Sequence, residues 1–141
     1  MIHAHAGFRF LILFFLLTAI IKSFIGWKNN KPFGKGDNII AIILLSFTHL
    51  QAIIGLGLYF MNGWSQQLGN MKDAEPRFWS MEHLLLMLFA VVLITVGRVK
   101  SKKATTDLLK HKKGLVFYSI ALFIILWGGV IQPYLLGRGW F

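Results

Sequence analysis

The chain has no cysteine among its 141 residues. This absence excludes disulfide bonds, thiolate metal sites, haem attached covalently through cysteine, and cysteine nucleophiles. A metal site in this chain would therefore use histidine, methionine, tyrosine or carboxylate. Acidic residues are also scarce, five against fifteen lysines and arginines. Paired catalytic carboxylates, a phosphate-binding glycine loop and a nucleophile elbow are missing from the sequence, which gives no support to a hydrolase or a transferase.

Hydrophobic residues dominate what is present. They make up 56% of the chain, only 14% of the residues are charged, and the mean hydropathy is +0.64. Four apolar stretches of about 20 residues each match a bilayer core of roughly 30 Å. The sequence therefore predicts an all-α integral membrane protein, a single domain over 1–141 folded as an up-down bundle of four transmembrane helices. The expected spans are 8–27, 38–62, 78–97 and 114–136.

The basic residues are distributed unevenly between the two sides of the predicted bundle. Of the fifteen, eleven flank the first and third loops and four lie on the other side. Basic loops stay in the cytoplasm, so we expect both termini and the loop 63–77 on the periplasmic side of a bacterial inner membrane. This placement explains the charge by topology and contact with membrane lipid, and not by binding of nucleic acid. The eleven are Lys22, Lys28, Lys31, Lys35, Arg98, Lys100, Lys102, Lys103, Lys110, Lys112 and Lys113, and the four are Arg9, Lys72, Arg77 and Arg138.

Two histidines, His49 and His83, fall inside predicted spans. An ionisable residue inside a membrane costs a few kcal/mol and is a functional hypothesis by default. Between helices, a metal is a natural partner for neutral imidazoles, and haem iron is the usual one in such bundles. The sequence therefore favours haem b with His49 and His83 as axial ligands. Thr48, Ala52, Gly55 and Tyr59 form a small, polar face near His49, and His83 shares a face with Met87, Ala90, Ile94 and Gly97, which include small residues and a thioether. Faces of this kind either pack on another helix or leave room for a flat cofactor.

Further candidates lie near the predicted outer boundary. His5 precedes the first span and can approach His83 in an antiparallel bundle, which makes it the alternative ligand; His49 is preferred because it lies deeper. Arg9 and Arg77 are candidate charge partners for haem propionates. Glu82 either accepts the free ring N–H of a ligating histidine or points outward and pairs with an arginine, Arg77 or Arg9.

One histidine is expected to have no site role. His111 stands among Lys110, Lys112 and Lys113, and we expect a solvated side chain there. It falls in the predicted third loop, 101–113, which can form a short helix on the cytoplasmic surface.

Several short motifs occur together along the chain. They are His3-Ala4-His5-Ala6-Gly7-Phe8-Arg9, Phe47-Thr48-His49-Leu50-Gln51, Arg77-Phe78 with Glu82-His83, Gly97-Arg98 with Lys100 to Lys103, and Thr106-Asp107 with Lys110 to Lys113. As a set, covering nearly the whole chain, they resemble small four-helix membrane proteins of Bacteroidetes that are labelled cytochrome b-like. The resemblance implies a four-helix membrane fold and a haem-linked role.

Three functions remain open on the sequence. The first is a haem b-binding electron-transfer protein, or a redox subunit, with a quinone or a larger respiratory complex as partner. The second is a cofactor-free accessory subunit of a homo-oligomer or larger assembly, whose histidines and Glu82 form hydrogen bonds between helices or subunits. The third is a non-haem metal site at the outer surface, built from His3, His5, Glu82 and His83.

Overall fold

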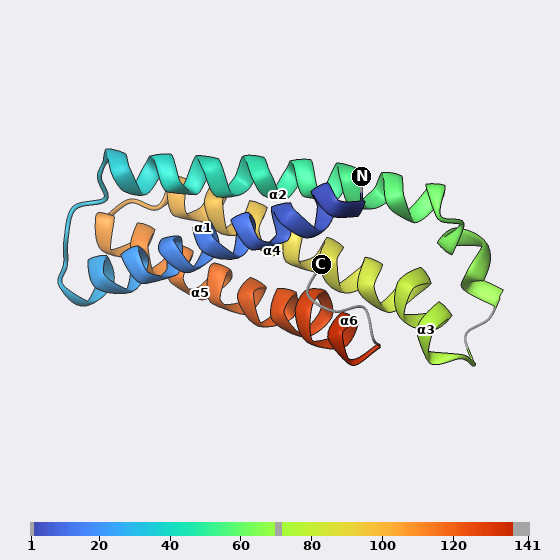
Figure 1. Cartoon of the computed structure of the whole chain (residues 1–141). Coiled ribbons are helices and arrows are strands. Elements are labelled where there is room, and N and C mark those ends of the chain that lie inside the picture. Colours follow the sequence, from blue (N-terminus) through green and yellow to red (C-terminus); the bar gives the residue numbers. More distant parts are fainter. Residues whose placement is uncertain (1, 70–71, 137–141) are drawn as a thin grey trace.

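The computed structural model describes residues 2–69 and 72–136, and within them the chain is helical without a strand (Figure 1). Four helical stretches are long and apolar enough to cross a membrane, as the sequence predicts. They are Ala4–Lys28, Lys35–Met61, Ala74–Lys103 and Asp107–Leu135.

The four stretches are built from long and short helical elements. The long helices are α1 (Ile2–Lys28), α2 (Lys35–Met61), α4 (His83–Lys103) and α5 (Asp107–Ile125). A 3₁₀ segment, η1 (Trp64–Gly69), follows α2, and a short helix, α3 (Ala74–Arg77), precedes the π-helical η2 (Phe78–Glu82), which runs directly into α4. The other π-helical segment, η3 (Leu126–Ile131), continues α5 into α6 (Gln132–Leu135).

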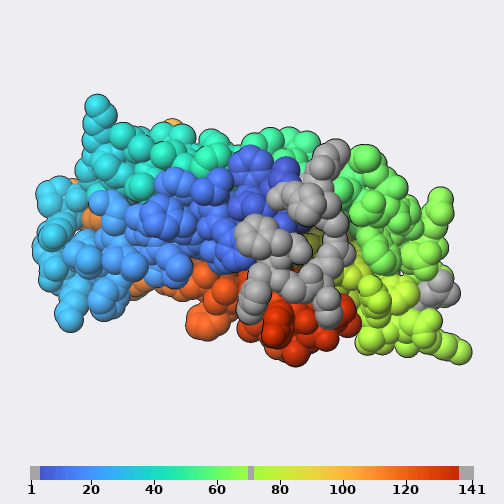
Figure 2. Space-filling model, viewed as in Figure 1, coloured from blue at the N-terminus to red at the C-terminus, as the bar shows by residue number. Residues whose placement is uncertain are grey.

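The long helices pack as a ring in the order α1, α2, α4, α5, with α1 diagonally across from α4. Consecutive helices run in opposite directions, and α2 and α4 project beyond the others at the end where η1 and α3 lie (Figure 1). Leu16, Leu44, Ile94 and Ala121, one from each long helix, are fully enclosed at the centre. Their burial shows that the apolar core lies along the bundle axis, and further apolar side chains cover the outside of the helices. In the space-filling view, α1 fills the visible face between α2 and α5 (Figure 2).

The third and fourth helices are longer than the sequence predicts, and the expected loop 101–113 shrinks to residues 104–106. Thr106 is the reason for the early start of α5, because its Oγ1 accepts a hydrogen bond from the Leu109 N–H, 3.2 Å away. A threonine in this position satisfies one of the free N–H groups of a helix's first turn. Residues 107–113 are therefore the first two turns of α5 and not a separate surface helix.

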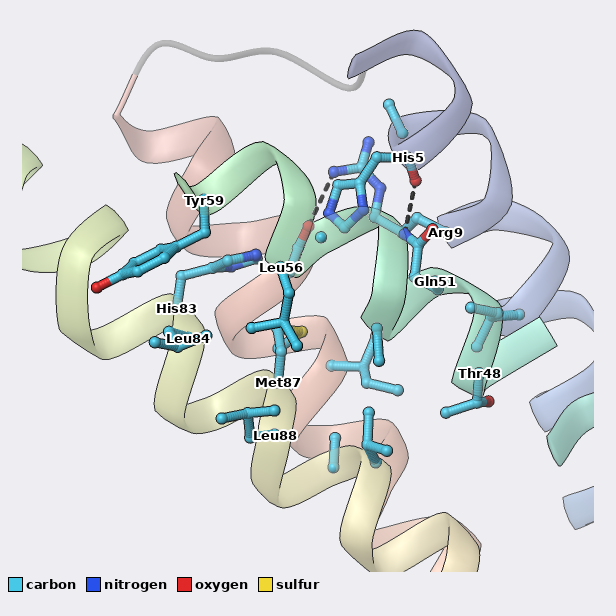
Figure 3. A pocket seen from close by; sticks show the side chains of 18 of the residues that line it. His5, Arg9, Thr48, Gln51, Leu56, Tyr59, His83, Leu84, Met87 and Leu88 are labelled. Atoms are coloured by element: carbon cyan, nitrogen blue, oxygen red, sulfur yellow. Dashed lines mark hydrogen bonds between the residues drawn. The ribbon is translucent and has the colours of Figure 1, made fainter. Parts of the chain in front are cut away.

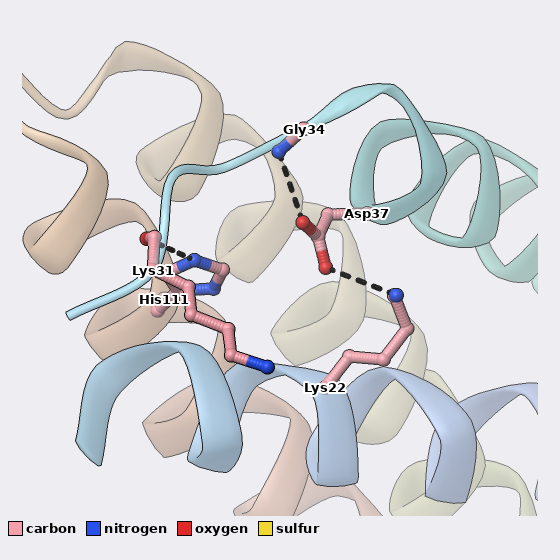
Figure 4. A network of polar contacts seen from close by, with 5 residues as sticks. All are labelled: Lys22, Lys31, Gly34, Asp37 and His111. Atoms are coloured by element: carbon pink, nitrogen blue, oxygen red, sulfur yellow. Dashed lines mark hydrogen bonds and ion pairs between the residues drawn. The ribbon is translucent and has the colours of Figure 1, made fainter. Parts of the chain in front are cut away.

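The two short connections, 29–34 and 104–106, meet at one end of the bundle, which we call the loop end (Figure 1). The prediction of a solvated His111 is wrong, since its side chain is 1% exposed there. Its Nε2 hydrogen-bonds to the Lys31 carbonyl at 3.1 Å (Figure 4). Its ring also lies against Gly26 and Phe33. The error arose because the segment after α1 folds back over α5, a contact that the charged neighbours of His111 do not reveal.

Other polar contacts close the loop end. Lys22 pairs with Asp37 at 3.6 Å, and Asp37 also accepts a hydrogen bond from the Gly34 N–H at 2.9 Å (Figure 4). Arg98, which is 6% exposed, donates from Nη2 to the Asn38 side-chain oxygen. All eleven basic residues of the larger group lie on the helix ends or loops of this end, whereas Arg138 of the smaller group lies outside the described residues.

Candidate functional site

The opposite end of the bundle is hollow. A cavity of about 160 Å³ lies between α1, α2, α4 and the end of the fourth span (Figure 3). We call this the cavity end. Most of the cavity wall is apolar, and its nitrogen- and hydroxyl-bearing side chains are His5, Arg9, Thr48, Gln51, Tyr59, Trp79 and His83.

Both helix faces predicted from residue spacing contribute to this cavity. On α2 the lining includes Thr48, Ala52, Gly55 and Tyr59, and on α4 it includes His83, Met87, Ala90 and Ile94. Of the two alternatives for such faces, packing on another helix or leaving room, these residues therefore border open space, whereas Gly97 lies outside the lining and packs against Phe117.

His83 is held in a defined orientation by η3. Its Nδ1 lies 2.8 Å from the Gly128 carbonyl oxygen, so Nδ1 carries the proton and donates it. Arg9 reaches the next carbonyl, with Nη1 2.9 Å from the Gly129 oxygen. The tautomer assigned to His83 leaves its Nε2 with a lone pair, the state in which an imidazole binds a metal.

The sequence explains why these two carbonyls are available. In an α-helix, the Gly128 and Gly129 carbonyls would accept from the N–H groups of residues 132 and 133. The Gln132 N–H instead bonds to the Trp127 carbonyl, which makes η3 π-helical, and Pro133 has no N–H to donate. Both carbonyls can therefore accept side-chain donors from other helices, which is a feature of π-bulges at functional sites.

His5 faces His83 across the bundle diagonal. Their ring centroids are 6.4 Å apart with an interplanar angle of 75°, and Figure 3 shows the side chain of His83 extending toward His5 and Arg9. The backbone carbonyl of His5 accepts a hydrogen bond from Gln51 Nε2 at 2.6 Å. Gly55 gives the His5 ring its room, because a Cβ there would lie 3.0 Å from His5 Cε1.

Two aromatic contacts and one polar atom complete the surroundings. The Trp79 and Phe78 rings lie 5.0 and 5.5 Å from the His83 ring. The Gln51 side-chain oxygen is buried and forms no hydrogen bond within the described part of the chain. A buried acceptor of this kind normally has a donor, so the cavity is suited to a ligand or an ordered water at this position.

His49 does not line the cavity and does not face His83. Its side chain is exposed on the outside of the bundle, where Nε2 lies 2.9 Å from Thr95 Oγ1 on α4. Thr95 follows His83 by twelve residues, which corresponds to roughly 18 Å along the helix axis. The structure therefore brings His83 together with His5, the alternative ligand, and not with His49.

Glu82 and Arg77 pair with each other instead of entering the cavity. The Arg77 Nε lies 2.8 Å from Glu82 Oε1, and neither residue belongs to the cavity lining. Of the two alternatives for Glu82, support of a ligating histidine or pairing with an arginine, the structure shows the pairing. Glu82 was also a candidate partner for a ring nitrogen of His83. That partner is instead the Gly128 carbonyl, which accepts a hydrogen bond from His83 Nδ1.

The contributions of Gln51, Trp79, Gly128 and Gly129 to this site were not predicted from the sequence. Of these, only the glycine carbonyls had a readable signal, because Pro133 removes the donor of one of them. Among the described residues, no three or more His, Cys, Asp or Glu side chains gather as a metal site. The side chain of His3, a candidate for the outer-surface metal site, lies outside the described part of the chain.

Searches of protein-family models, curated proteins and solved structures found no match to this chain.

Proposed function

We propose that the chain binds one haem b at the cavity end, with His5 and His83 as axial ligands, and serves as an electron-transfer protein of the bacterial inner membrane. The observation that carries the proposal is the orientation of His83. Its Nδ1–H is fixed on the Gly128 carbonyl, and its ring faces a second imidazole across a cavity. Metal-ligating histidines almost always donate their other ring N–H to such a partner.

The donor set and its spacing fit the group. Two imidazoles that bind one metal ion from opposite sides, with bonds of about 2.0 Å, have ring centroids roughly 6 Å apart, and those of His5 and His83 are 6.4 Å apart. Gly55 supplies space beside His5 that a larger residue would fill. The largely apolar wall suits a flat, lipophilic ring.

The other polar side chains of the cavity, Arg9 and Gln51, would also contribute to haem binding. Arg9 places a cationic group in the cavity wall, where it would attract the carboxylates of a haem. Gln51 holds the first turn of α1 through the His5 carbonyl and thereby positions the His5 side chain. When bound, the haem supplies the one-electron chemistry, and the protein supplies ligation, orientation and exclusion of water.

The proposal also specifies how the bundle is oriented in the membrane. Eleven basic residues at the loop end support a cytoplasmic position for that end, and hence a periplasmic position for the cavity end and both termini. In this orientation the haem would lie close to the periplasmic surface, within reach of a quinone or a larger respiratory complex.

Visible spectroscopy tests the proposal. The protein, purified from cells with full haem supply, should show sharp Soret and α bands after reduction with dithionite. His5→Ala and His83→Ala should each lose the low-spin α band, while His49→Ala, outside the cavity, should retain it. Circular dichroism checks that all three variants keep their helices. A colourless wild-type protein would contradict haem binding, and loss of the bands in His49→Ala with retention in His5→Ala would contradict the ligand assignment.

A cofactor-free accessory subunit is the second candidate, and the contacts of His49 favour it. Its Nε2 joins α2 to α4 through Thr95, and His83 joins α4 to η3. Hydrogen bonds between helices are what this function requires of membrane-embedded histidines. If the chain is a cofactor-free accessory subunit, the purified protein should be colourless and His83→Ala should lower its thermal stability.

A further inference from the structure

The outer surface of α2 differs from that of the other three long helices. Every exposed side chain is hydrophobic between Leu11 and Ile25 on α1, between Leu85 and Val99 on α4, and between Val116 and Ile131 on the fourth span. On α2, two exposed polar side chains, Ser46 and His49, interrupt the apolar surface near the middle of the helix. They belong to a single outward row, the α2 stripe, which consists of Ile42, Ser46, His49, Ile53, Leu56 and Phe60.

This position is unfavourable for a helix that faces lipid. His49 lies 14 residues after the start of α2 and 12 before its end, so in a bilayer it would be near the midplane. Polar side chains at that depth almost always face protein or a water-filled cavity. Lipid tails offer neither donors nor acceptors, so the α2 stripe is better suited to contact with protein.

The hydrogen bonds of His49 show which group a protein in contact with the α2 stripe must provide. The Thr95 hydroxyl donates to the Val91 carbonyl at 2.7 Å, so it accepts from the His49 Nε2–H. His49 is therefore protonated on Nε2, and its Nδ1 carries an exposed lone pair that needs a donor. Ser46, one turn earlier, has a hydroxyl that donates to no described residue.

We propose that the α2 stripe is the contact surface between two copies of this chain, related by a two-fold axis along the membrane normal. Such an axis places equivalent residues of both copies at the same depth and makes each contact occur twice. Ser46 and His49 are three residues apart, about 4.5 Å along the helix. The Ser46 hydroxyl of one copy can therefore donate to His49 Nδ1 of the other, and the reverse bond forms at the same time.

The α2 stripe is self-complementary, because it carries both the donor, the Ser46 hydroxyl, and the acceptor, His49 Nδ1. A second copy of the chain therefore fits the α2 stripe better than a different protein does. Ser46 is also small, which lets two α2 helices approach closely, as small residues do at helix interfaces in membranes. The inference does not depend on haem binding, because Ser46 and His49, which carry it, lie outside the cavity lining; of the α2 stripe, Leu56 is the member that also borders the cavity.

Because the chain has no cysteine, single introduced cysteines can test the contact in native membranes. Ile53→Cys places a thiol on the α2 stripe, one turn from His49. Phe123→Cys is the matched control, since Phe123 is 74% and Ile53 69% exposed, and the two residues lie at similar distances from the loop end, 16 residues after Asp107 and 18 residues after Lys35. After oxidation with copper phenanthroline, Ile53→Cys should give a disulfide-linked species of twice the 16.1 kDa monomer mass, and Phe123→Cys only background.

A second variant tests the hydrogen bond itself. Ile53→Cys combined with Ser46→Ala keeps the small side chain but removes the donor, and the yield of linked dimer should fall several-fold. Equal cross-linking of Ile53→Cys and Phe123→Cys would overturn the proposal. So would an unchanged yield in the Ser46→Ala background, or an adduct whose mass identifies another protein.

Discussion

The two ends of the bundle both bury polar side chains, but only one end keeps space beside them. At the loop end, Arg98 and His111 lie against Asn38 and the 29–34 connection, and a void there has a volume of only about 10 Å³. At the cavity end, His83 and Arg9 bond to helix carbonyls and still border a cavity of about 160 Å³. The difference indicates that the polar groups of the loop end fill the space between helices and loops, whereas those of the cavity end join helices and leave open space beside them.

Asn38→Leu should give the largest effect on stability. It removes the side-chain oxygen that accepts from Arg98 Nη2, and Arg98 Nη1 already has no partner among the described residues. A buried cation left without hydrogen bonds costs about 3 kcal/mol. We expect the free energy of unfolding in detergent to fall by this amount, measured by chemical or thermal denaturation.

Gln51→Leu is the matched change at the cavity end. It removes one hydrogen bond to the His5 carbonyl, and the neighbouring cavity can admit water, so a loss of about 1 kcal/mol or less is expected. Equal losses from both substitutions would contradict the distinction between a closely packed loop end and an open cavity end.

Gly26→Ala should destabilise the loop end by about 2 kcal/mol. A Cβ at this position would lie 2.4 Å from atoms of the His111 ring, which is enclosed and held by the Lys31 carbonyl. Gly55→Ala at the cavity end should cost less than about 1 kcal/mol, because its Cβ would lie 3.0 Å from His5 Cε1 and the His5 ring borders open space.

Thermal unfolding of the double variant Gly26→Ala, His111→Ala provides the control for this steric explanation. Removing the imidazole should suppress the cost of the alanine at position 26. An additive loss in the double variant would show that the cost arises elsewhere.

Helix periodicity grouped the residues that line the cavity on α2 and α4 but did not predict the histidine pair. Thr48 and His49 are neighbours in sequence, yet successive residues of a helix point about 100° apart. Thr48 therefore faces inward and His49 outward, and the sequence did not show which of the two faced the core. The number of helices followed from hydropathy alone. The burial of His111 depends on a loop that is distant in sequence, which neither local pattern nor charge could predict.

Pro133→Ala should affect the cavity end alone. The substitution restores an N–H at position 133, which can bond to the Gly129 carbonyl and compete with Arg9. If Arg9 orients a haem carboxylate, as proposed, loosening its support should weaken haem binding about tenfold, equivalent to about 1.4 kcal/mol. Absorbance titration of the apoprotein with haem measures this effect. Unchanged affinity would show that the Gly129 contact does not contribute to the site.

Glu82→Gln should have the smallest effect. The Glu82 and Arg77 side chains are 33% and 40% exposed, and solvent screens such pairs, so at most about 0.5 kcal/mol of stability is expected to be lost. The glutamine oxygen can still accept from Arg77, and Glu82 lies outside the cavity lining, so the visible spectrum should not move. A shifted α band in this variant would instead assign Glu82 to the support of a haem ligand, the role that its position beside His83 in the sequence suggests.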